Sequence, residues 1–425
     1  MTRKWILAAA LLLAAGNAGA ANPELKYVVI VSRHGVRSPT WDAARLNRYS
    51  ARPWPDWGVA PGELTPHGRD LILILGRYYR DWLVGQGLLG AAGCRDAGRV
   101  FVHADAEQRT LETGRAFAES ILPGCGVALH SHPGGHDPLF SGVGAADPRL
   151  SLQAVGARLG SDARKLLVEH REAVDTLQFL LTGGQPAPLK LLDPPAEIGV
   201  EIAGKSVEMK GPFAAGSTLS EVFLLEYANG FRAPDLAWGR LTKENLYRAM
   251  ELHKVYADLM RRTPYLARAR GSNLLAHVAR SLEQAASGSA VPGALGRPGD
   301  ALLLLAGHDT NLSNLSGMLD LSWRLPGYQA DDTPPGGALI FSLWRSSSGH
   351  LSVRTEYLAE TLDQMRNADR LTLKDPPASQ EVRIPGCVAA DREPGCSWTD
   401  FRRIVNKAID PAFTSADDSS GGEVR

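Results

Sequence analysis

Three short apolar runs, each followed directly by charged residues, set the pattern of this chain. They occupy residues 26–31, 99–103 and 301–306. Continuous apolar runs of this length are typical of strands that are buried on both faces of a parallel sheet. The charged residues then follow the carboxyl ends of the strands, where open α/β sheets bind ligands. The pattern predicts an α/β fold with a mostly parallel central sheet flanked by helices.

The stretch between the second and third runs has a different texture. Apolar residues recur at helical spacing over 152–181 and 241–267, which predicts helices. We therefore expect a smaller, all-helical domain at 151–265, inserted so that it covers the ligand edge of the sheet. The other expected segments are a discontinuous catalytic α/β domain at 21–150 and 266–413 and a polar, disordered tail at 414–425.

Composition narrows the classes of function. The chain has 425 residues, of which 44% are hydrophobic, and its 46 basic and 46 acidic side chains balance. The basic footprint of a nucleic-acid-binding protein is absent from the bulk, so no nucleic-acid partner is expected. Any anion site has to be built locally, by clustering of cations.

The N-terminus predicts export. Arg3 and Lys4 precede a short apolar stretch at 6–15, and the small residues at 18–20 fit a cleavage site. We interpret residues 1–20 as a signal peptide of a periplasmic or secreted protein. The apolar run is too short for a membrane span, so no membrane association is expected after its removal.

Export would place the cysteines in an oxidising compartment. The four are Cys94, Cys125, Cys387 and Cys396, which allow three pairings. Local pairing, Cys94 with Cys125 and Cys387 with Cys396, is favoured because each pair closes a short loop. No Cys-x-x-Cys is present, and no metal is expected. The histidine-rich run 130–136 is interpreted as a loop, with a metal-binding tract as the alternative.

The first charged cluster is the heptapeptide Arg33-His34-Gly35-Val36-Arg37-Ser38-Pro39. Arginine supplies planar, permanently charged donors that match phosphate oxygens. A histidine between two arginines can attack phosphorus, which splits one hydrolysis into two easier steps. Gly35 lets the backbone pass close to a ligand. A surface turn with unrelated charges is the alternative, but the combination favours a phosphoryl-transfer site centred on His34.

Two further clusters are expected at the same edge. His308 and Asp309 follow the third run, and Arg109 begins a helix after the second. The imidazole can donate a hydrogen bond to a transferring phosphoryl group, and the carboxylic acid can protonate the departing alkoxide. Asp309 must then be protonated part of the time, which predicts an acidic pH optimum. Thr310 lies at the start of the next helix, where backbone donors favour anions.

Together these motifs carry a family resemblance. The chain resembles the two-domain histidine acid phosphatases, in particular the bacterial periplasmic phytase and glucose-1-phosphatase group. The likeness lies in residues 33–40, 64–68, 104–113, 219–225, 238–240, 262–264, 306–312, 325–327, 333–337 and 384–387.

The resemblance implies roles for the matching residues. His34 is the implied nucleophile and Asp309 the implied proton donor. The implied phosphate ligands are Arg33, Arg37, Arg109 and His308. The substrate-facing rim would contain Thr40, Glu221, His253, Arg270 and Thr310. The family needs no metal or other cofactor, and it implies the inserted helical domain and the two local disulfides.

One departure from the family pattern concerns the rim. Phytases of this group often place a lysine just after the threonine at position 40, whereas this chain has Trp41 and Asp42. Phytate carries many phosphates, so a less cationic rim weakens the phytase assignment. The sequence predicts a monomeric, metal-independent acid phosphomonoesterase acting on phytate or sugar phosphates. The alternatives are a phosphatase of the glucose-1-phosphatase type and a phosphate-ester binding protein without turnover.

Overall fold

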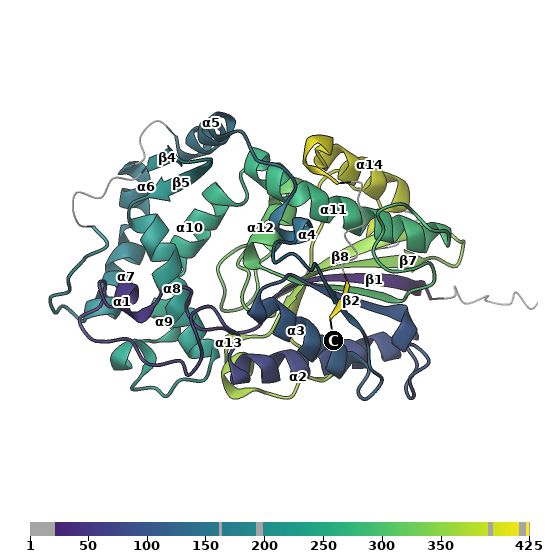
Figure 1. Ribbon diagram of the computed structural model, residues 1–425, viewed down its shortest axis with the longest axis horizontal. Helices are drawn as coiled ribbons and strands as arrows, with labels where there is room; N and C mark the ends of the chain where they lie inside the picture. Colours follow the sequence, from purple (N-terminus) through teal and green to yellow (C-terminus); the bar gives the residue numbers. More distant parts are fainter. Residues whose placement is uncertain (1–21, 161–163, 193–198, 390–393, 416–421, 425) are drawn as a thin grey trace, which may run out of the picture.

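A mixed nine-stranded sheet forms the larger half of the molecule (Figure 1). The computed structural model describes residues 22–160, 164–192, 199–389, 394–415 and 422–424. The strand order is β10-β8-β7-β1-β6-β2-β3-β11, and β9 pairs with β8. The parallel centre consists of β1 (Glu24–Arg33), β6 (Leu302–Gly307), β2 (Val100–Ala104) and β3 (Leu129–Ser131). The antiparallel strands are β7 (Ala338–Arg345), β8 (Leu351–Ala359), β9 (Ala378–Glu381), β10 (Cys396–Ser397) and β11 (Gly422–Val424).

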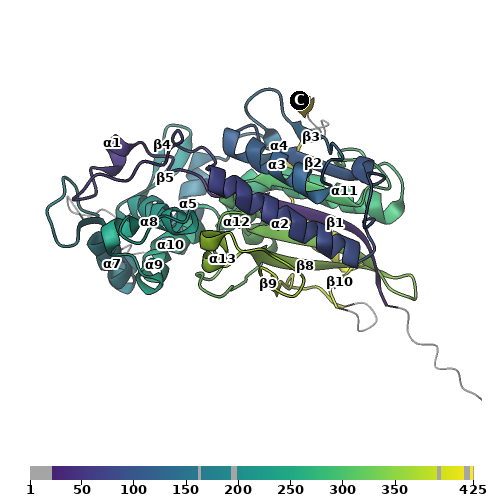
Figure 2. The ribbon, with the colours of Figure 1, turned by 90° about the horizontal axis from the view of Figure 1, so that it is seen from below.

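Helices cover both faces of this sheet, as the sequence predicted. Val28 and Ile30 of β1 belong to the core shared with α2 (Pro66–Gly85) and α3 (Gln108–Ile121). Val29 and Val31 belong to the opposite core, which contains α11 (Pro264–Ser287), α12 (Asp309–Leu319) and α14 (Trp398–Ala408). Figure 2 shows α2 lying along one face. Because alternate residues face different apolar layers, the strand reads as a run without alternation.

The start of α2 comes very close to the turn after β1. Thr65 caps the helix by accepting the Gly68 N–H, and Pro66 occupies the first turn. A Cβ at Gly68 would overlap the Val36 carbonyl. The glycine is therefore required by the close approach, and it fixes α2 against the turn that contains His34.

The inserted region lies beside the carboxyl edge of the central strands (Figure 1). Its helices are α5 (Pro148–Leu159), α6 (Arg164–Glu169), α7 (Arg171–Thr182), α8 (Pro212–Ala228), α9 (Lys243–Ala249) and α10 (Glu251–Met260). The short helices elsewhere are α1 (Ala43–Leu46), α4 (Pro138–Ser141) and α13 (Leu362–Asn367), with 3-10 turns at Ala97–Arg99, Leu236–Gly239 and Pro411–Phe413.

The prediction that the insert is all helical is wrong. It contains the antiparallel hairpin of β4 (Gly199–Ala203) and β5 (Ser206–Lys210). In β5, Val207 and Met209 are buried while their neighbours are exposed. This alternation has the period of two that a half-buried strand requires. The positive φ of Gly204, 61°, closes the turn between the two strands.

The loop that leaves the His34 turn attaches to the insert. The ring of Trp54 stacks on Phe223 of α8 with centroids 5.0 Å apart. The indole N–H of Trp238 donates to the Pro53 carbonyl at 2.9 Å, and the Leu189 N–H donates to the Arg48 carbonyl at 2.7 Å. The loop therefore belongs to the wall of the insert, although it follows β1 in the sequence.

Both predicted disulfides are confirmed. Cys94 pairs with Cys125, and Cys387 with Cys396, each with Cα atoms 5.1 Å apart. The second bridge ties Cys387 to Cys396 of β10, and β10 pairs with β8. In the histidine-rich run, His130 lies in β3 and stacks on Phe101 with centroids 4.2 Å apart.

The ends of the chain differ from expectation in one respect. The expectation that the tail 414–425 is disordered is wrong for Gly422–Val424, which pair as β11 with β3. It is also wrong for Ser415, whose N–H donates to the Asn273 side chain at 2.9 Å. The expected signal peptide at 1–20 lies outside the described residues. None of the helices that the structure describes is both long and apolar enough to cross a bilayer.

A buried carboxyl group makes the stability of this fold depend on pH. Glu360, just after β8, is 2% exposed, and burial, with Asp369 nearby, raises its pKa from 4.5 to about 8. Burial also raises the pKa of Glu226 to about 8. In the unfolded chain both carboxyl groups ionise near pH 4.5. The stability that they contribute to the fold is therefore fully present below that pH. That contribution is lost as the pH rises through about 8.

Glu360→Gln is expected to flatten this pH dependence. The free energy of unfolding should fall less between about pH 5 and about pH 8 in the variant, because glutamine cannot ionise. The difference should be a few kcal/mol, since one pKa unit is worth about 1.4 kcal/mol. Urea unfolding at both pH values measures it, with the exposed Glu24→Gln as control. Equal pH slopes for wild type and Glu360→Gln would contradict the assignment.

Candidate active site

The carboxyl ends of the central strands bring the charged clusters together. Both β1 and β2 pair in parallel with β6, and Arg33 lies beside Gly307 in this register. His34, Asp105 and His308 follow these strands directly, so they start from one edge of the sheet. The insert lies beside this edge (Figure 1).

The ring of His34 is held in one tautomer. Its Nδ1 lies 2.8 Å from the Gly35 carbonyl oxygen, and a carbonyl only accepts, so Nδ1 carries the proton. Nε2 is then the nitrogen whose lone pair can attack an electrophile. Burial, followed by the charges of Arg33, Arg37, Arg109 and His308, lowers the pKa of His34 well below its usual value. This shift favours the neutral, nucleophilic form of the ring.

The backbone around His34 is equally constrained. The His34 N–H donates to the Gly307 carbonyl at 2.8 Å, which ties the turn to β6. The Gly35 N–H donates to the Thr113 hydroxyl of α3 at 3.0 Å. A Cβ at Gly35 would lie 2.9 Å from the Gly68 carbonyl oxygen, so a larger residue would push α2 away. Three neighbouring elements thus fix the position of the ring.

Two buried arginines of this turn share one carboxylate. Arg33 and Arg37 each donate to a different oxygen of Glu221 on α8, Arg37 at 2.9 Å. Arg33 also donates to the Thr333 carbonyl at 2.6 Å. The Nε atoms of Arg33, Arg37 and Arg109 are buried and have no hydrogen-bond partner among the described residues. The cluster therefore retains donors for an anion.

An acidic pair holds the other two predicted phosphate ligands. His308 Nε2 lies 2.7 Å from Asp105 Oδ2 and 3.3 Å from Glu107 Oε2. Arg109 forms an ion pair with Glu107. The rings of His308 and His34 lie 5.6 Å apart, edge to face. The sequence did not assign Asp105 or Glu107 to the site, although both lie directly after β2 and within the family-like stretch 104–113.

Asp309 is an ion-paired carboxylate in this structure. Its Oδ1 accepts the Thr310 N–H at 2.8 Å, and its Oδ2 accepts Arg261 Nη1 at 2.6 Å. His253 Nε2 lies 3.9 Å from the same Oδ2. Burial alone would raise the pKa of Asp309, but Arg261, Arg33 and His253 outweigh it and hold the pKa well below its usual value. The partial protonation expected from the sequence therefore does not describe the free site.

The structure distributes the predicted rim residues unevenly. Glu221 lies at the centre, where burial is outweighed by Arg37 and Arg33 and its pKa is lowered to about 2. His253 is 4% exposed, with Nδ1 3.1 Å from the Ser217 hydroxyl. The Thr310 N–H donates a hydrogen bond to Asp309 Oδ1. The other two lie near site residues: Thr40 is exposed and lies beside Gly62, as does the Arg109 guanidinium, and Arg270 of α11 interacts electrostatically with Tyr256 and Arg261 of the cavity lining.

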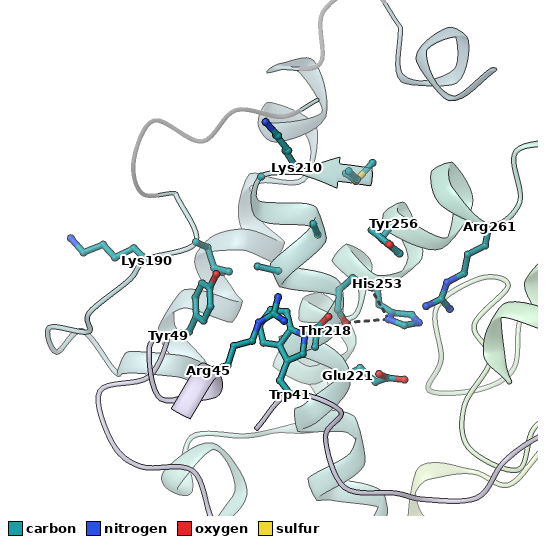
Figure 3. A pocket seen from close by; sticks show the side chains of 16 residues that line it. Trp41, Arg45, Tyr49, Lys190, Lys210, Thr218, Glu221, His253, Tyr256 and Arg261 are labelled. Atoms are coloured by element: carbon teal, nitrogen blue, oxygen red, sulfur yellow. Dashed lines mark hydrogen bonds between the residues drawn. The ribbon is translucent and has the colours of Figure 1, made fainter. Parts of the chain in front are cut away.

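A cavity of about 780 Å³ lies between the insert and the loop that follows the His34 turn (Figure 3). Four cations line it: Arg45, Lys190, Lys210 and Arg261. Figure 3 shows Lys190 and Arg261 on opposite sides. Among the described residues of the lining, Glu221 is the only acid, and it is already paired. Sequence analysis missed these four cations, because they come from four separate segments.

Within the part of the chain that the structure describes, two groups of side chains are close enough to hold a cation. They are Asp105, Glu107 and His308, and Glu221, His253 and Asp309. Guanidinium groups already neutralise an acid in each, since Arg109 pairs with Glu107 and Arg261 with Asp309. A metal ion would have to displace these arginines, whereas an anion would meet donors that are still available.

Several known proteins resemble this chain over most of its length. The family model described as "Histidine phosphatase superfamily (branch 2)" matches residues 24–188 and 218–357. Phytase AppA of Escherichia coli is 36% identical over 92% of this chain and 94% of its own length. Glucose-1-phosphatase of Salmonella typhimurium is 28% identical, over 95% and 97% of the two chains.

Solved structures give the same result. Hafnia alvei phytase in complex with tartrate has a TM-score of 0.85 at 35% identity, covering 92% of this chain and 98% of its own. The same phytase in complex with myo-inositol hexakis sulphate has a TM-score of 0.83 at 34% identity, with the same coverage. With the family match spanning most of its length, the chain belongs to branch 2 of the histidine phosphatase superfamily and is a histidine acid phosphatase.

Proposed function

We propose that His34 is the nucleophile and Asp309 the proton donor of a phosphomonoesterase. The observation that carries this proposal is the His34 ring, whose Nδ1 is bound by the Gly35 carbonyl so that Nε2 is left for attack, beside arginines whose buried Nε–H donors have no partner among the described residues. A phosphate ester beside Nε2 would take charge-assisted hydrogen bonds from Arg33, Arg37 and Arg109.

The reaction then has two steps. Nε2 of His34 forms a bond to phosphorus while the bond to the leaving oxygen breaks, and Asp309 Oδ2 gives that oxygen a proton. Water next attacks the phosphohistidine, the P–N bond breaks, and the Asp309 carboxylate takes a proton from the water. The arginines and His308 stabilise the charge on the phosphoryl oxygens in both transition states.

The cavity supports a polyphosphorylated substrate of the phytate class. Asp42, which counted against this class in the sequence, caps α1 by accepting the Arg45 N–H at 2.7 Å. The Arg45 guanidinium lies 3.7 Å from the centroid of the Trp41 ring. The loop therefore contributes a cation, Arg45, four residues after Trp41. Lys190, Lys210 and Arg261 also line the cavity, where Lys210 is ion-paired with Glu201 at 2.7 Å and Arg261 with Asp309 at 2.6 Å. The complex of Hafnia alvei phytase with myo-inositol hexakis sulphate supports the same substrate class.

Location and assembly follow the same proposal. The bonded cysteine pairs favour an oxidising compartment, such as the periplasm or the exterior. Every group of the candidate site comes from one chain, which is consistent with action as a monomer.

His34→Ala is expected to abolish hydrolysis of p-nitrophenyl phosphate. The loss should exceed about a thousandfold, as is typical for removal of a nucleophile. Mass spectrometry of protein denatured at alkaline pH during turnover should find phosphate on His34 in the wild type. The exposed His136→Ala serves as control. Residual activity above about a thousandth would overturn the assignment.

Glu221→Gln should destabilise the free protein and make phosphate a stronger stabiliser. Removing one partner of a buried ion pair costs roughly 3–5 kcal/mol, because Arg33 and Arg37 are left uncompensated. Inorganic phosphate would restore negative charge, so it should raise the unfolding temperature more in the variant than in the wild type. Thermal unfolding with and without phosphate measures this. An equal phosphate-induced shift would show that the carboxylate does not balance the anion site.

The double variant Lys190→Gln/Lys210→Gln should discriminate between the substrate classes. For inositol hexakisphosphate we expect kcat/KM to fall by about tenfold or more, since a hydrogen bond to a charged group is worth roughly 1.5–3 kcal/mol. Glucose 1-phosphate, with one phosphate, should be hydrolysed nearly as before. The exposed Lys374→Gln is the matched control. Equal losses on both substrates, or a wild-type preference for glucose 1-phosphate, would favour the sugar-phosphate alternative.

A further inference from the structure

The ion pair between Arg261 and Asp309 conflicts with the proton-donor role. The two carboxylate oxygens of Asp309 are in different positions. Oδ1 is bound by the backbone N–H of Thr310 at the start of α12, at 2.8 Å. Oδ2 is therefore the oxygen that can carry and deliver a proton, and Arg261 Nη1 lies 2.6 Å from it. Arg261 has to release this oxygen before Asp309 can act as an acid.

The position of Arg261 indicates what could release it. Arg261 lies directly after α10, lines the substrate cavity, and is 5.7 Å from the ring centroid of Tyr256. Its guanidinium thus binds the proton donor and also lines the cavity, in which the leaving alcohol of the substrate would lie. An anionic group on that alcohol would compete with Asp309 for the same guanidinium, and it would gain a planar, two-pronged donor.

We propose that Arg261 is a specificity-determining residue that exchanges the Asp309 carboxylate for a second phosphate group on the leaving alcohol. This inference rests on the proposed function of His34 and Asp309. A substrate with a second phosphate draws Arg261 from Oδ2, and Asp309 then takes a proton from solvent. Asp309 gives this proton to the leaving oxygen as the P–O bond breaks. A substrate with one phosphate leaves the ion pair intact, so its alkoxide departs without an efficient acid.

Electrostatics around Asp309 are consistent with this exchange. Arg261 is the strongest of the cationic influences that keep the pKa of Asp309 low against the effect of burial. The other charged or titratable groups that act on Asp309 are Arg33 of β1, Arg109 of α3, Glu221 of α8, His253 of α10 and Tyr357 of β8. A bound phosphate would neutralise the arginines at His34, but it leaves the contact with Arg261 in place.

The test compares Arg261→Gln with wild type on three substrates. They are inositol hexakisphosphate, n-propyl phosphate and p-nitrophenyl phosphate. For the hexakisphosphate kcat/KM should fall by roughly tenfold, as expected for the loss of one charge-assisted contact. For propyl phosphate it should rise, because Asp309 is no longer held as a carboxylate. For p-nitrophenyl phosphate, whose leaving group needs no proton, it should change least.

The pH profile supplies a readout that a merely structural role would not move. The basic limb of kcat/KM reports the pKa of the acid in the free enzyme. Without Arg261 the Asp309 carboxyl keeps its proton to higher pH, so the limb for propyl phosphate should shift upward. Arg261→Lys keeps the charge and should leave the limb close to wild type. The exposed Arg268→Gln, outside the cavity lining, controls for loss of an arginine.

The outcomes separate the two proposals. Equal loss on all three substrates with an unmoved limb, or no change at all, would overturn the role of Arg261. Arg261→Lys decides the question if the glutamine variant does not fold, because an upward shift of its limb would contradict the charge argument. Absence of phosphohistidine at His34 in wild type would instead overturn the proposed function. If phosphohistidine forms in both wild type and variant while the substrate pattern and the pH limb do not change as expected, only the proposed role of Arg261 is overturned.

Discussion

One buried carboxylate, that of Glu221, connects the two halves of this molecule. It accepts hydrogen bonds from Arg33 and Arg37, which lie on the turn after β1, while Glu221 itself lies on α8 of the insert. Two arginines this close would repel each other in a buried site, and the carboxylate compensates them. Its pKa of about 2 keeps the negative charge in place in acid. This interaction therefore contributes both to the attachment of the insert and to the assembly of the anion site.

Arg33 and Arg109 act on two groups with different tasks. Burial and positive charge lower the pKa of His34, which favours the unprotonated ring, and positive charge lowers the pKa of Asp309, which favours the ionised acid. The first effect favours a nucleophile, whereas the second opposes a proton donor. A phosphate ester brings negative charge to both, so the substrate itself has to complete the acid. The ion pair with Arg261 makes this requirement stricter than the arginines at His34 would alone.

The rigid and the variable parts of the site have different structural origins. The groups around His34 come from strand ends and helix starts, fixed by the sheet register and by the close packing at Gly35 and Gly68. The cavity wall comes from loops and from the insert, including β5 and the loop with Trp41 and Arg45. A scaffold of this kind holds the chemistry constant while the surrounding segments determine which esters fit.

The sequence by itself determined the three buried strands, the charged clusters after them, both disulfides and the existence of an insert. These features are local, because a strand run, a turn motif or a short disulfide loop is readable within a few neighbouring residues. The hairpin in the insert and the strand Gly422–Val424 were missed, since short strands give weak periodic signals. Only the tertiary structure paired Glu221 with Arg33 across 188 positions and Arg261 with Asp309 across 48. Such pairings depend on how separate elements pack, and that packing is not contained in the pattern of any one segment.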